Sequence, residues 1–253
     1  MSGHSKWSTI KRKKGAEDAK RAKIFTRLAR DVMVAAREGG GDETMNPKLK
    51  LAIAKAKEAN MPNDNIDRAI KRGTGELDGG EVEELTYEGY GIEGVAFIVE
   101  TLTDNKNRTL AEVKNVFNKN GGNLAQGGAV AWQFDQKGYI TLLREDNPAM
   151  DFEELFMVAA EAGADDVSEE NNVVVVYTPR DLFGSVEQAL RTNGYKADDA
   201  ELRWFPQNEL EVSVNAGLRN MRIMERLEDL DDVQSVASNL SITENLLEAF
   251  ESA

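Results

Sequence analysis

Apolar residues return at helical spacing through the first part of the chain. Projected at 100° per residue, those between residues 16 and 38 fall on one face of a helix. That face carries Phe25, Leu28, Val32 and Ala36. The opposite face carries Lys20, Lys23, Arg27, Arg30 and Arg37. The pattern predicts a helix from Ala16 to Glu38, ended by the glycines at 39–41, with one face in a core and a positive ridge on the other.

Two shorter helices are expected next. Asn46 is a suitable N-cap, and Pro47 fits the first turn, where its missing N–H is not needed. A third helix is expected to be capped in the Asn63–Asp64 region and to stop at Gly73. Three helices with small apolar faces predict a compact helical module. Residues 73–80 hold four glycines and predict a linker after it.

Beyond the linker the period changes to strands that alternate with helices. Residues 83–104 predict two strands around a tight glycine turn. In the helix expected next, Thr109 and Glu112 are spaced as a capping box, and Gly121–Gly122 form its stop. Residues 129–143 predict a pair of strands hinged near Lys137–Gly138.

The middle of the chain predicts a complete small α/β domain. Its expected elements are a strand at 139–143, a helix at about 150–162, strands near 164–168 and 172–178, a helix at about 180–194 and a strand at 197–205. This βαββαβ order is the split ferredoxin-like arrangement.

The C-terminal part repeats some of this pattern. An extended piece at 209–214, a helix and a final strand would complete a second βαββαβ unit begun at 84–136, with the middle unit inserted in it. The prediction is an α+β protein with three domains, of which the second and third are ferredoxin-like. The expected domains are a basic arm and helical domain at 1–75, a discontinuous α/β domain at 81–136 plus 206–253, and an inserted α/β domain at 137–205.

Charge is unevenly distributed along the 253 residues, whose formal net charge is -14. Residues 1–80 hold 18 Lys and Arg against 11 Asp and Glu, whereas residues 81–253 hold 13 against 34. Such a polarised molecule can offer one end to a polyanion while its bulk is repelled from it. An ordinary solvated helical face is the alternative interpretation of the basic part.

Nine of the ten basic residues in the first thirty positions are the candidate phosphate contacts. They are Lys6, Lys11, Arg12, Lys13 and Lys14, followed by Lys20, Lys23, Arg27 and Arg30 on the expected first helix. Trp7 and His4 are candidates for stacking on exposed bases. The alternative interpretation of Trp7 is an apolar anchor that holds the arm to the helical module. The alternative for His4 is a residue of the N-terminal tail without a specific role. An extended basic arm suits RNA or backbone contacts better than groove reading.

Several other chemistries find little support. The chain has no cysteine, and its single histidine excludes two-histidine metal sites, so no catalytic residues, metal or cofactor are predicted. Residues 89–94 match G-x-G-x-x-G, but an apolar β-branched run follows them where a dinucleotide site needs a helix. A hairpin turn is therefore expected there. The many carboxylates are expected to form a solubilising surface. No apolar run approaches the roughly 20 residues that span a bilayer, and the expected location is the cytoplasm.

A second candidate anion site lies before the helix expected at 107–123. Lys106 precedes this helix and Arg108 lies in its first turn, where backbone N–H groups attract anions. Asp104 opposes an anion there, and turn formation explains the asparagines of this stretch equally well.

Several long motifs resemble one known family in consistent order. They include GHSKWSTIK, AKIFTRLARD, ANMPNDNIDRAIKRG, YEGYGIEG, TDNKNRT and RLEDLDDVQSV, and the match runs from residue 3 to about residue 238. The chain is similar to the YebC/PmpR family, which includes a mitochondrial translational activator of cytochrome c oxidase. The resemblance implies a cytoplasmic three-domain α/β protein with a helical N-terminal domain. Family members are described as probable transcriptional regulators that bind promoter DNA, or as ribosome-associated factors that help translation, including through proline-rich stalls.

The combined hypothesis is a cytoplasmic, non-enzymatic regulator that binds DNA through its basic N-terminal domain. The alternative is a translation factor that binds RNA on the ribosome. A nucleotide-using enzyme built on residues 89–94 is the third hypothesis, and a hairpin at that turn would exclude it. No membrane and no small-molecule partner are expected, and the acidic domains would face away from the nucleic acid or contact protein.

Overall fold

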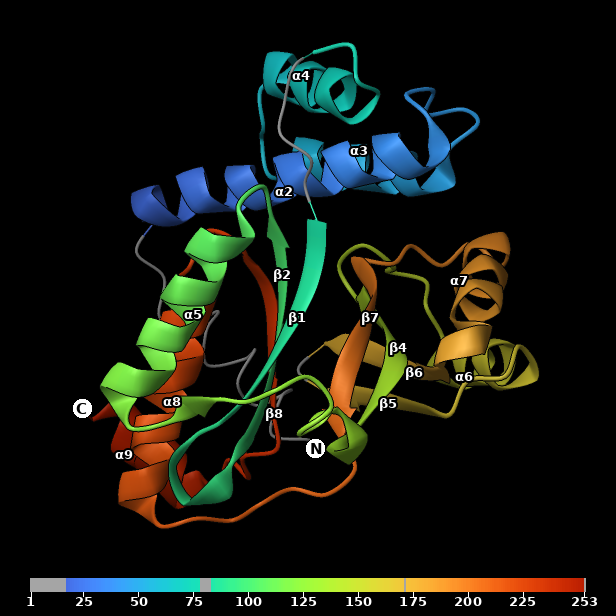
Figure 1. Cartoon of the computed structure of the whole chain (residues 1–253). Helices are drawn as coiled ribbons and strands as arrows, with labels where there is room; N and C mark the ends of the chain where they lie inside the picture. The colour runs from blue at the N-terminus through green and yellow to red at the C-terminus, as the bar shows by residue number, and fades with distance from the viewer. Residues whose placement is uncertain (1–16, 78–82, 171, 253) are drawn as a thin grey trace. The chain divides into compact units, whose positions relative to one another are not determined.

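The computed structural model describes residues 17–77, 83–170 and 172–252, which form two compact units (Figure 1). The first unit combines residues up to Ala131 with those from Glu209 onward, and the second holds Trp132–Asn208. The second unit is therefore an insertion in the chain of the first. Both mix helices with antiparallel sheets, and the predicted α+β class is confirmed.

Three helices form the N-terminal part of the first unit, as the apolar spacing predicts. They are α2 (Glu17–Gly39), α3 (Pro47–Glu58) and α4 (Asn63–Gly73). Their apolar faces meet in a small core that includes Val32, Leu49 and Ile66. At Gly73 an added Cβ would lie 2.3 Å from the carbonyl oxygen of Met33, so only glycine allows α4 to approach α2 this closely.

Asn46 joins the end of α2 to the start of α3. Its side-chain oxygen accepts from the N–H of Leu49 at 3.0 Å, which is the predicted cap. Its amide nitrogen donates to the carbonyls of Ala35 at 2.7 Å and Gly40 at 2.8 Å. One buried side chain thus satisfies the end of one helix and the start of the next.

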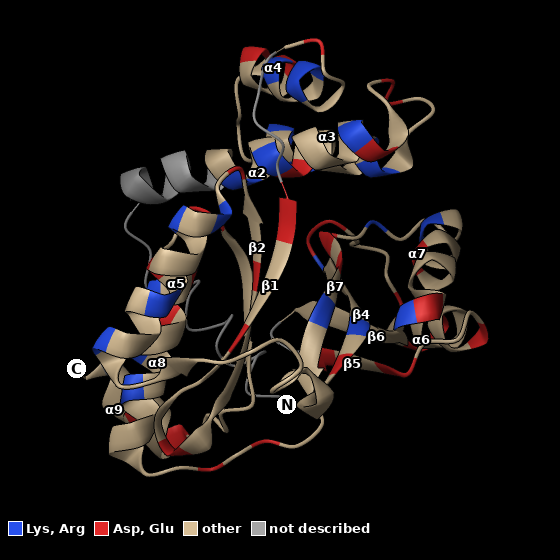
Figure 2. Cartoon of the chain, viewed as in Figure 1, with Lys and Arg blue, Asp and Glu red and all other residues tan. Residues whose placement is uncertain are grey.

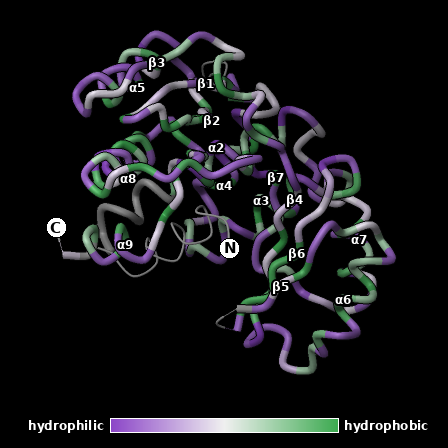
Figure 3. The backbone as a smooth tube through the Cα atoms, turned by 90° about the horizontal axis from the view of Figure 1, so that it is seen from below, coloured by the Kyte–Doolittle hydropathy of each residue, from purple (hydrophilic) through white to green (hydrophobic). Residues whose placement is uncertain are grey.

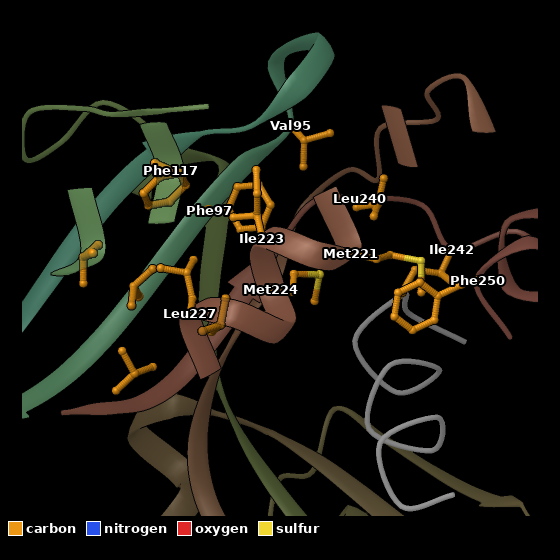
Figure 4. Close-up of a cluster of buried hydrophobic side chains, with 14 of the residues drawn as sticks. Val95, Phe97, Phe117, Met221, Ile223, Met224, Leu227, Leu240, Ile242 and Phe250 are labelled. Carbon is orange, nitrogen blue, oxygen red and sulfur yellow. The ribbon is translucent and has the colours of Figure 1, made fainter. Parts of the chain in front are cut away.

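A four-stranded antiparallel sheet follows, with three helices and one hydrophobic core (Figure 4). Its strands, in the order β3-β1-β2-β8, are β1 (Glu83–Tyr90), β2 (Ala96–Thr103), β3 (Asn123–Leu124) and β8 (Val233–Ser238). The helices are α5 (Lys106–Asn120), α8 (Val214–Glu228) and α9 (Glu244–Glu251). Phe97 and Phe117 pack edge to face in the core, with ring centroids 5.7 Å apart.

The element order of this part differs from the predicted βαββαβ. The chain runs β1-β2-α5-β3, leaves for the inserted unit, and returns as α8-β8-α9. The hairpin expected at residues 83–104 joins β1 directly to β2, so no α-helix lies between the first two strands, as a βαββαβ order would require.

The inserted unit has the predicted ferredoxin-like arrangement. Its elements are β4 (Phe134–Leu143), α6 (Phe152–Glu161), β5 (Asp166–Glu170), β6 (Val173–Pro179), α7 (Phe183–Thr192) and β7 (Asp199–Pro206). The strand order is β5-β6-β4-β7, and all neighbouring strands are antiparallel. Buried residues recur at every second position of β6, the pattern of a strand with one face in a core; Figure 3 colours the chain by hydropathy.

Short 3-10 turns connect some of these elements. They are η1 (Ile92–Gly94), η2 (Ala131–Gln133) and η3 (Arg180–Leu182).

Three local predictions are corrected. Strand β4 runs without a hinge through Gly138, whose missing side chain leaves room for Thr178 and Phe183. The N-cap of α5 is Asn105, not Thr109, because Asn105 precedes Thr109 in the chain and its side chain accepts a hydrogen bond from the N–H of Arg108. The third helix begins at Asn63 itself, after Pro62.

The turn at residues 91–94 is the predicted hairpin, with Tyr90 paired to Ala96 across it. The buried amide of Asn220 on α8 holds the turn, since it accepts from the N–H of Ile92 at 2.9 Å and donates to the carbonyl of Ile92 at 3.0 Å. An added Cβ at Gly91 would lie 2.0 Å from the Asn220 oxygen. The turn leads into strand β2, so the dinucleotide-site interpretation of this motif is wrong.

Candidate nucleic-acid interface

Most of the predicted arm contacts lie outside the described residues. They are His4, Lys6, Trp7, Lys11, Arg12, Lys13 and Lys14. Lys20 and Lys23 lie on α2, but their side chains are also outside the described part.

The predicted positive ridge of α2 divides into two parts. Arg27 is exposed, as expected. Arg30 is only 15% exposed, and its Nη2 lies 2.6 Å from Oδ1 of Asp232. Val34, which shares this side of the helix, packs with Leu102 of β2. Part of the ridge thus contacts the sheet of the same unit, and Arg30 already has an anionic partner.

Asp232, just before β8, collects hydrogen bonds from three other side chains. Its Oδ2 accepts from Nη2 of Arg108 and from Oγ1 of Thr109, both at 2.6 Å, and from Oγ1 of Thr103 at 3.0 Å. Burial raises the pKa of this carboxyl, but the hydrogen bonds from Thr109 and Arg108 and the charge of Arg30 outweigh burial and lower the pKa.

The two cations of the second candidate anion site, Lys106 and Arg108, also form ion pairs with carboxylates of this chain. Nζ of Lys106 lies 2.6 Å from Oε2 of Glu83, and Arg108 pairs with both Asp104 and Asp232. The cations at the start of α5 therefore hold carboxylates of the same chain. An external phosphate would have to displace these carboxylates.

Helix α4 carries cations that the sequence-based candidates did not include. Arg68, Lys71 and Arg72 are exposed and form no ion pair within the described chain. Arg68 and Arg72 stand one turn apart with Asn65 on one flank of the helix. A helical projection at 100° per residue places Asn65, Arg68 and Arg72 on one side of α4, so the sequence alone could have identified these residues as a basic flank. Figure 2 shows the basic residues on α3 and α4.

This flank of α4 and the facing side of α2 line a groove of about 250 Å³. Its lining residues are Phe25, Thr26, Ala29 and Met33 from α2, and Asn65, Arg68, Ala69 and Arg72 from α4. The apolar side chains of Phe25, Ala29, Met33 and Ala69 form its floor, Arg68 and Arg72 bring two guanidinium groups, and none of the described lining residues is a carboxylate. Such a groove attracts an anion that also carries an apolar or aromatic portion.

The other flank of α4 has a different character. It borders a wider depression of about 900 Å³ whose charged residues are Asp42, Glu43, Lys57, Asp67, Lys71 and Glu76. Four carboxylates against two lysines make this side unfavourable for a polyanion. The α2–α4 groove is therefore the candidate interface.

Other kinds of site find no support in the described part of the chain. Its Asp and Glu residues form no group that could hold a metal ion. None of its helices combines the length and the apolar character that crossing a membrane requires.

Comparisons with known proteins agree with the motif resemblance. Residues 5–76 match the sequence model of the TACO1/YebC protein N-terminal domain, and residues 82–240 match that of the TACO1/YebC second and third domain. A "probable transcriptional regulatory protein" of Trichlorobacter lovleyi is 50% identical over 248 residues, which cover 98% of this chain and 99% of that protein. One of Natranaerobius thermophilus with the same description is 49% identical over 249 residues, covering 98% of this chain and 99% of that protein.

A solved structure has the same fold. The crystal structure of a conserved hypothetical protein from Aquifex aeolicus is 42% identical in sequence and superposes with a TM-score of 0.81, covering 90% of this chain and 93% of that one. The names of the relatives support a regulatory role for the chain. Because the two sequence models and the relatives together span nearly all of its length, the chain belongs to the TACO1/YebC family.

Proposed function

We propose that this protein is a non-enzymatic regulator that binds DNA through its basic N-terminal domain. The observation that carries the proposal is the pair Arg68 and Arg72, exposed beside a groove whose lining includes no carboxylate among the residues that the structure describes. Phosphate binding of this kind is driven by counterion release and needs cations that are not neutralised by their own protein. Arg27 on α2 is a further exposed cation of the helical module, and we expect the basic residues of the arm to add phosphate contacts.

The acidic charge of the rest of the chain supports binding through the N-terminal domain. Residues 81–253 hold 34 Asp and Glu against 13 Lys and Arg, so this part is repelled by a polyanion. The acidic part orients the protein so that the helical module meets the nucleic acid first. In a bacterial cell, such as those of the relatives, this action takes place in the cytoplasm.

The alternative target is RNA on the ribosome. The apolar floor of the groove favours it, because RNA offers unpaired bases in its loops and bulges whereas promoter duplex offers mainly phosphates and groove edges. A translation factor could then act by shape and phosphate contacts without reading a DNA sequence.

One experiment separates the two targets. The full chain is titrated with promoter DNA and with a scrambled duplex of equal length, and in parallel is sedimented with ribosomes across a salt series. Tighter binding to promoter DNA than to the scrambled duplex supports the transcriptional role. Equal binding to both duplexes, together with co-sedimentation with ribosomes, replaces that role by the translational one. Absence of binding to all three contradicts the proposal.

A further inference from the structure

We propose that the α2–α4 groove holds one unpaired base of a single-stranded nucleic acid, with Arg68 and Arg72 on the flanking phosphates. The inference rests on the proposed function and adds the form of nucleic acid that this site selects. It follows from the size of the groove, its lining and the placement of its charges.

The groove is smaller than the pockets that usually enclose a drug-sized ligand. Its volume of about 250 Å³ lies below the roughly 300–1,000 Å³ of pockets that enclose a drug-sized ligand. The floor is formed by Phe25, Ala29, Met33 and Ala69, which present only carbon and sulfur atoms from their side chains. A planar base buries its faces well against such a surface, whereas a sugar or a phosphate does not.

The spacing of the helices fixes the groove before any ligand enters. Met33 lies in the lining, and its carbonyl oxygen meets Gly73 so closely that no Cβ fits between the two helices. Buried side chains on both helices, Val32 and Ile66 among them, pack in one core beneath the groove. A site held by packed helices is preorganised, so little ordering is needed when the base enters.

The charges suit the backbone on either side of the base. Arg68 and Arg72 are four residues apart on α4, which places their Cβ atoms about 5–6 Å apart, and both side chains line the groove. Each can contact one phosphate of a strand whose base enters between the helices. Asn65 stands on the same flank, and its amide offers both a donor and an acceptor to the edge of a base.

A duplex cannot use this groove in the same way. Paired bases are stacked inside the helix and expose only their edges, so the apolar floor would remain empty against a duplex. Single strands expose the faces of their bases, and stacking on protein side chains is the usual way to bind them without reading sequence.

The test uses the full-length chain and synthetic strands of about twelve nucleotides. The strands are oligo-uridine, the same backbone without bases, and a duplex. Ala29→Leu fills the groove without changing charge, and Ala29 is only half-buried, so the helix core tolerates the larger side chain. Arg68→Ala/Arg72→Ala removes the two cations. Arg37→Ala/Lys50→Ala is the matched control, because these exposed residues lie outside the groove and make no ion pair in the described chain.

The expected result for Ala29→Leu is a roughly tenfold loss of affinity for oligo-uridine and no change for the abasic strand. Arg68→Ala/Arg72→Ala weakens both more than the control does. If Ala29→Leu leaves oligo-uridine binding unchanged while the arginine variant weakens it, the groove holds no base and the inference fails, although the proposed function stands. If the arginine variant binds every strand as the control does, the proposed function fails at this site.

A second measurement does not depend on the folding of a variant. Oligo-uridine that carries a photoreactive base is cross-linked to the unaltered protein, and the modified peptide is identified by mass spectrometry. Cross-links to Phe25, Met33 or Asn65 support the inference. Cross-links confined to other parts of the chain overturn it.

Discussion

Arg30 on α2 and Asp232 before β8 form an ion pair between residues 202 positions apart in the sequence, with Nη2 of the arginine 2.6 Å from Oδ1 of the aspartate. The pair joins the helical module to the sheet of the same unit. Because Arg108 binds the other oxygen of the same carboxylate, a single buried acidic side chain serves two cations from different helices. This arrangement explains why part of the basic face of α2 is directed toward the sheet of the same unit.

Removal of the Asp232 charge should destabilise the fold. The variant Asp232→Asn leaves Arg30 and Arg108 without their common partner, and breaking such a buried pair costs about 3 kcal/mol. Denaturant unfolding of the variant and the unaltered protein measures the difference. Asp181→Asn, an exposed carboxyl of the inserted unit, is the control and should change the free energy of unfolding by less than about 0.5 kcal/mol. Equal stability of all three proteins would show that the pair contributes nothing.

The same carboxyl predicts a pH dependence. Its pKa is lowered in the folded protein, so its contribution to stability is complete above the unfolded-state value of about 3.9 and is lost as the pH falls through the folded value. The difference in unfolding free energy between the unaltered protein and Asp232→Asn should therefore be constant between pH 5 and pH 7, because pH 5 already lies about one unit above the unfolded-state pKa. It should shrink at lower pH. A difference that grows on acidification contradicts the assigned direction.

Gly73→Ala tests the close approach of α4 to α2. The added methyl would lie 2.3 Å from the Met33 carbonyl oxygen, so the helices must separate at a cost of about 1–3 kcal/mol. Gly184→Ala on α7 is the matched control, because a Cβ there meets nothing within 4 Å and alanine favours a helix. Thermal unfolding should show a lower midpoint for the first variant and an equal or higher one for the second.

The basic arm should contribute to binding independently of the groove. Replacing Lys11, Arg12, Lys13 and Lys14 by alanine is expected to weaken nucleic-acid binding and to flatten the plot of log affinity against log salt by about 3–4 units, at roughly 0.9 per phosphate contact. Fluorescence anisotropy across a salt series measures the slope. An unchanged slope removes the arm from the mechanism.

Local signals in the sequence predicted local structure well. The Asn46 cap, the stop of α5 at the left-handed Gly121 and the hairpin after Tyr90 are confirmed, because each depends on neighbours within a few residues. The Thr109–Glu112 capping box is wrong for the same local reason, since Asn105 competes for the start of the helix. The hydroxyl of Thr109 is used instead by Asp232.

The hydrophobic periodicity of the sequence could not predict contacts between residues that lie far apart along the chain. A helical projection placed Arg30 on the polar face of α2, but it could not show that a carboxylate 202 positions later meets that face. The groove also required the packing of two helices, which meet at Gly73 and in a shared hydrophobic core. The charge imbalance did predict that the helical module is the basic part of the chain, and the structure shows which of its cations are unpaired within the described residues.

The most direct measurement of the central claim is the salt dependence of nucleic-acid affinity for Arg68→Ala/Arg72→Ala. Lys114→Ala/Lys119→Ala removes the same charge from exposed positions on α5 and is the control. The α4 variant should bind more weakly and lose about 2 units of slope, while the control keeps the slope of the unaltered protein. Equal slopes for the two variants would contradict a nucleic-acid interface on α4.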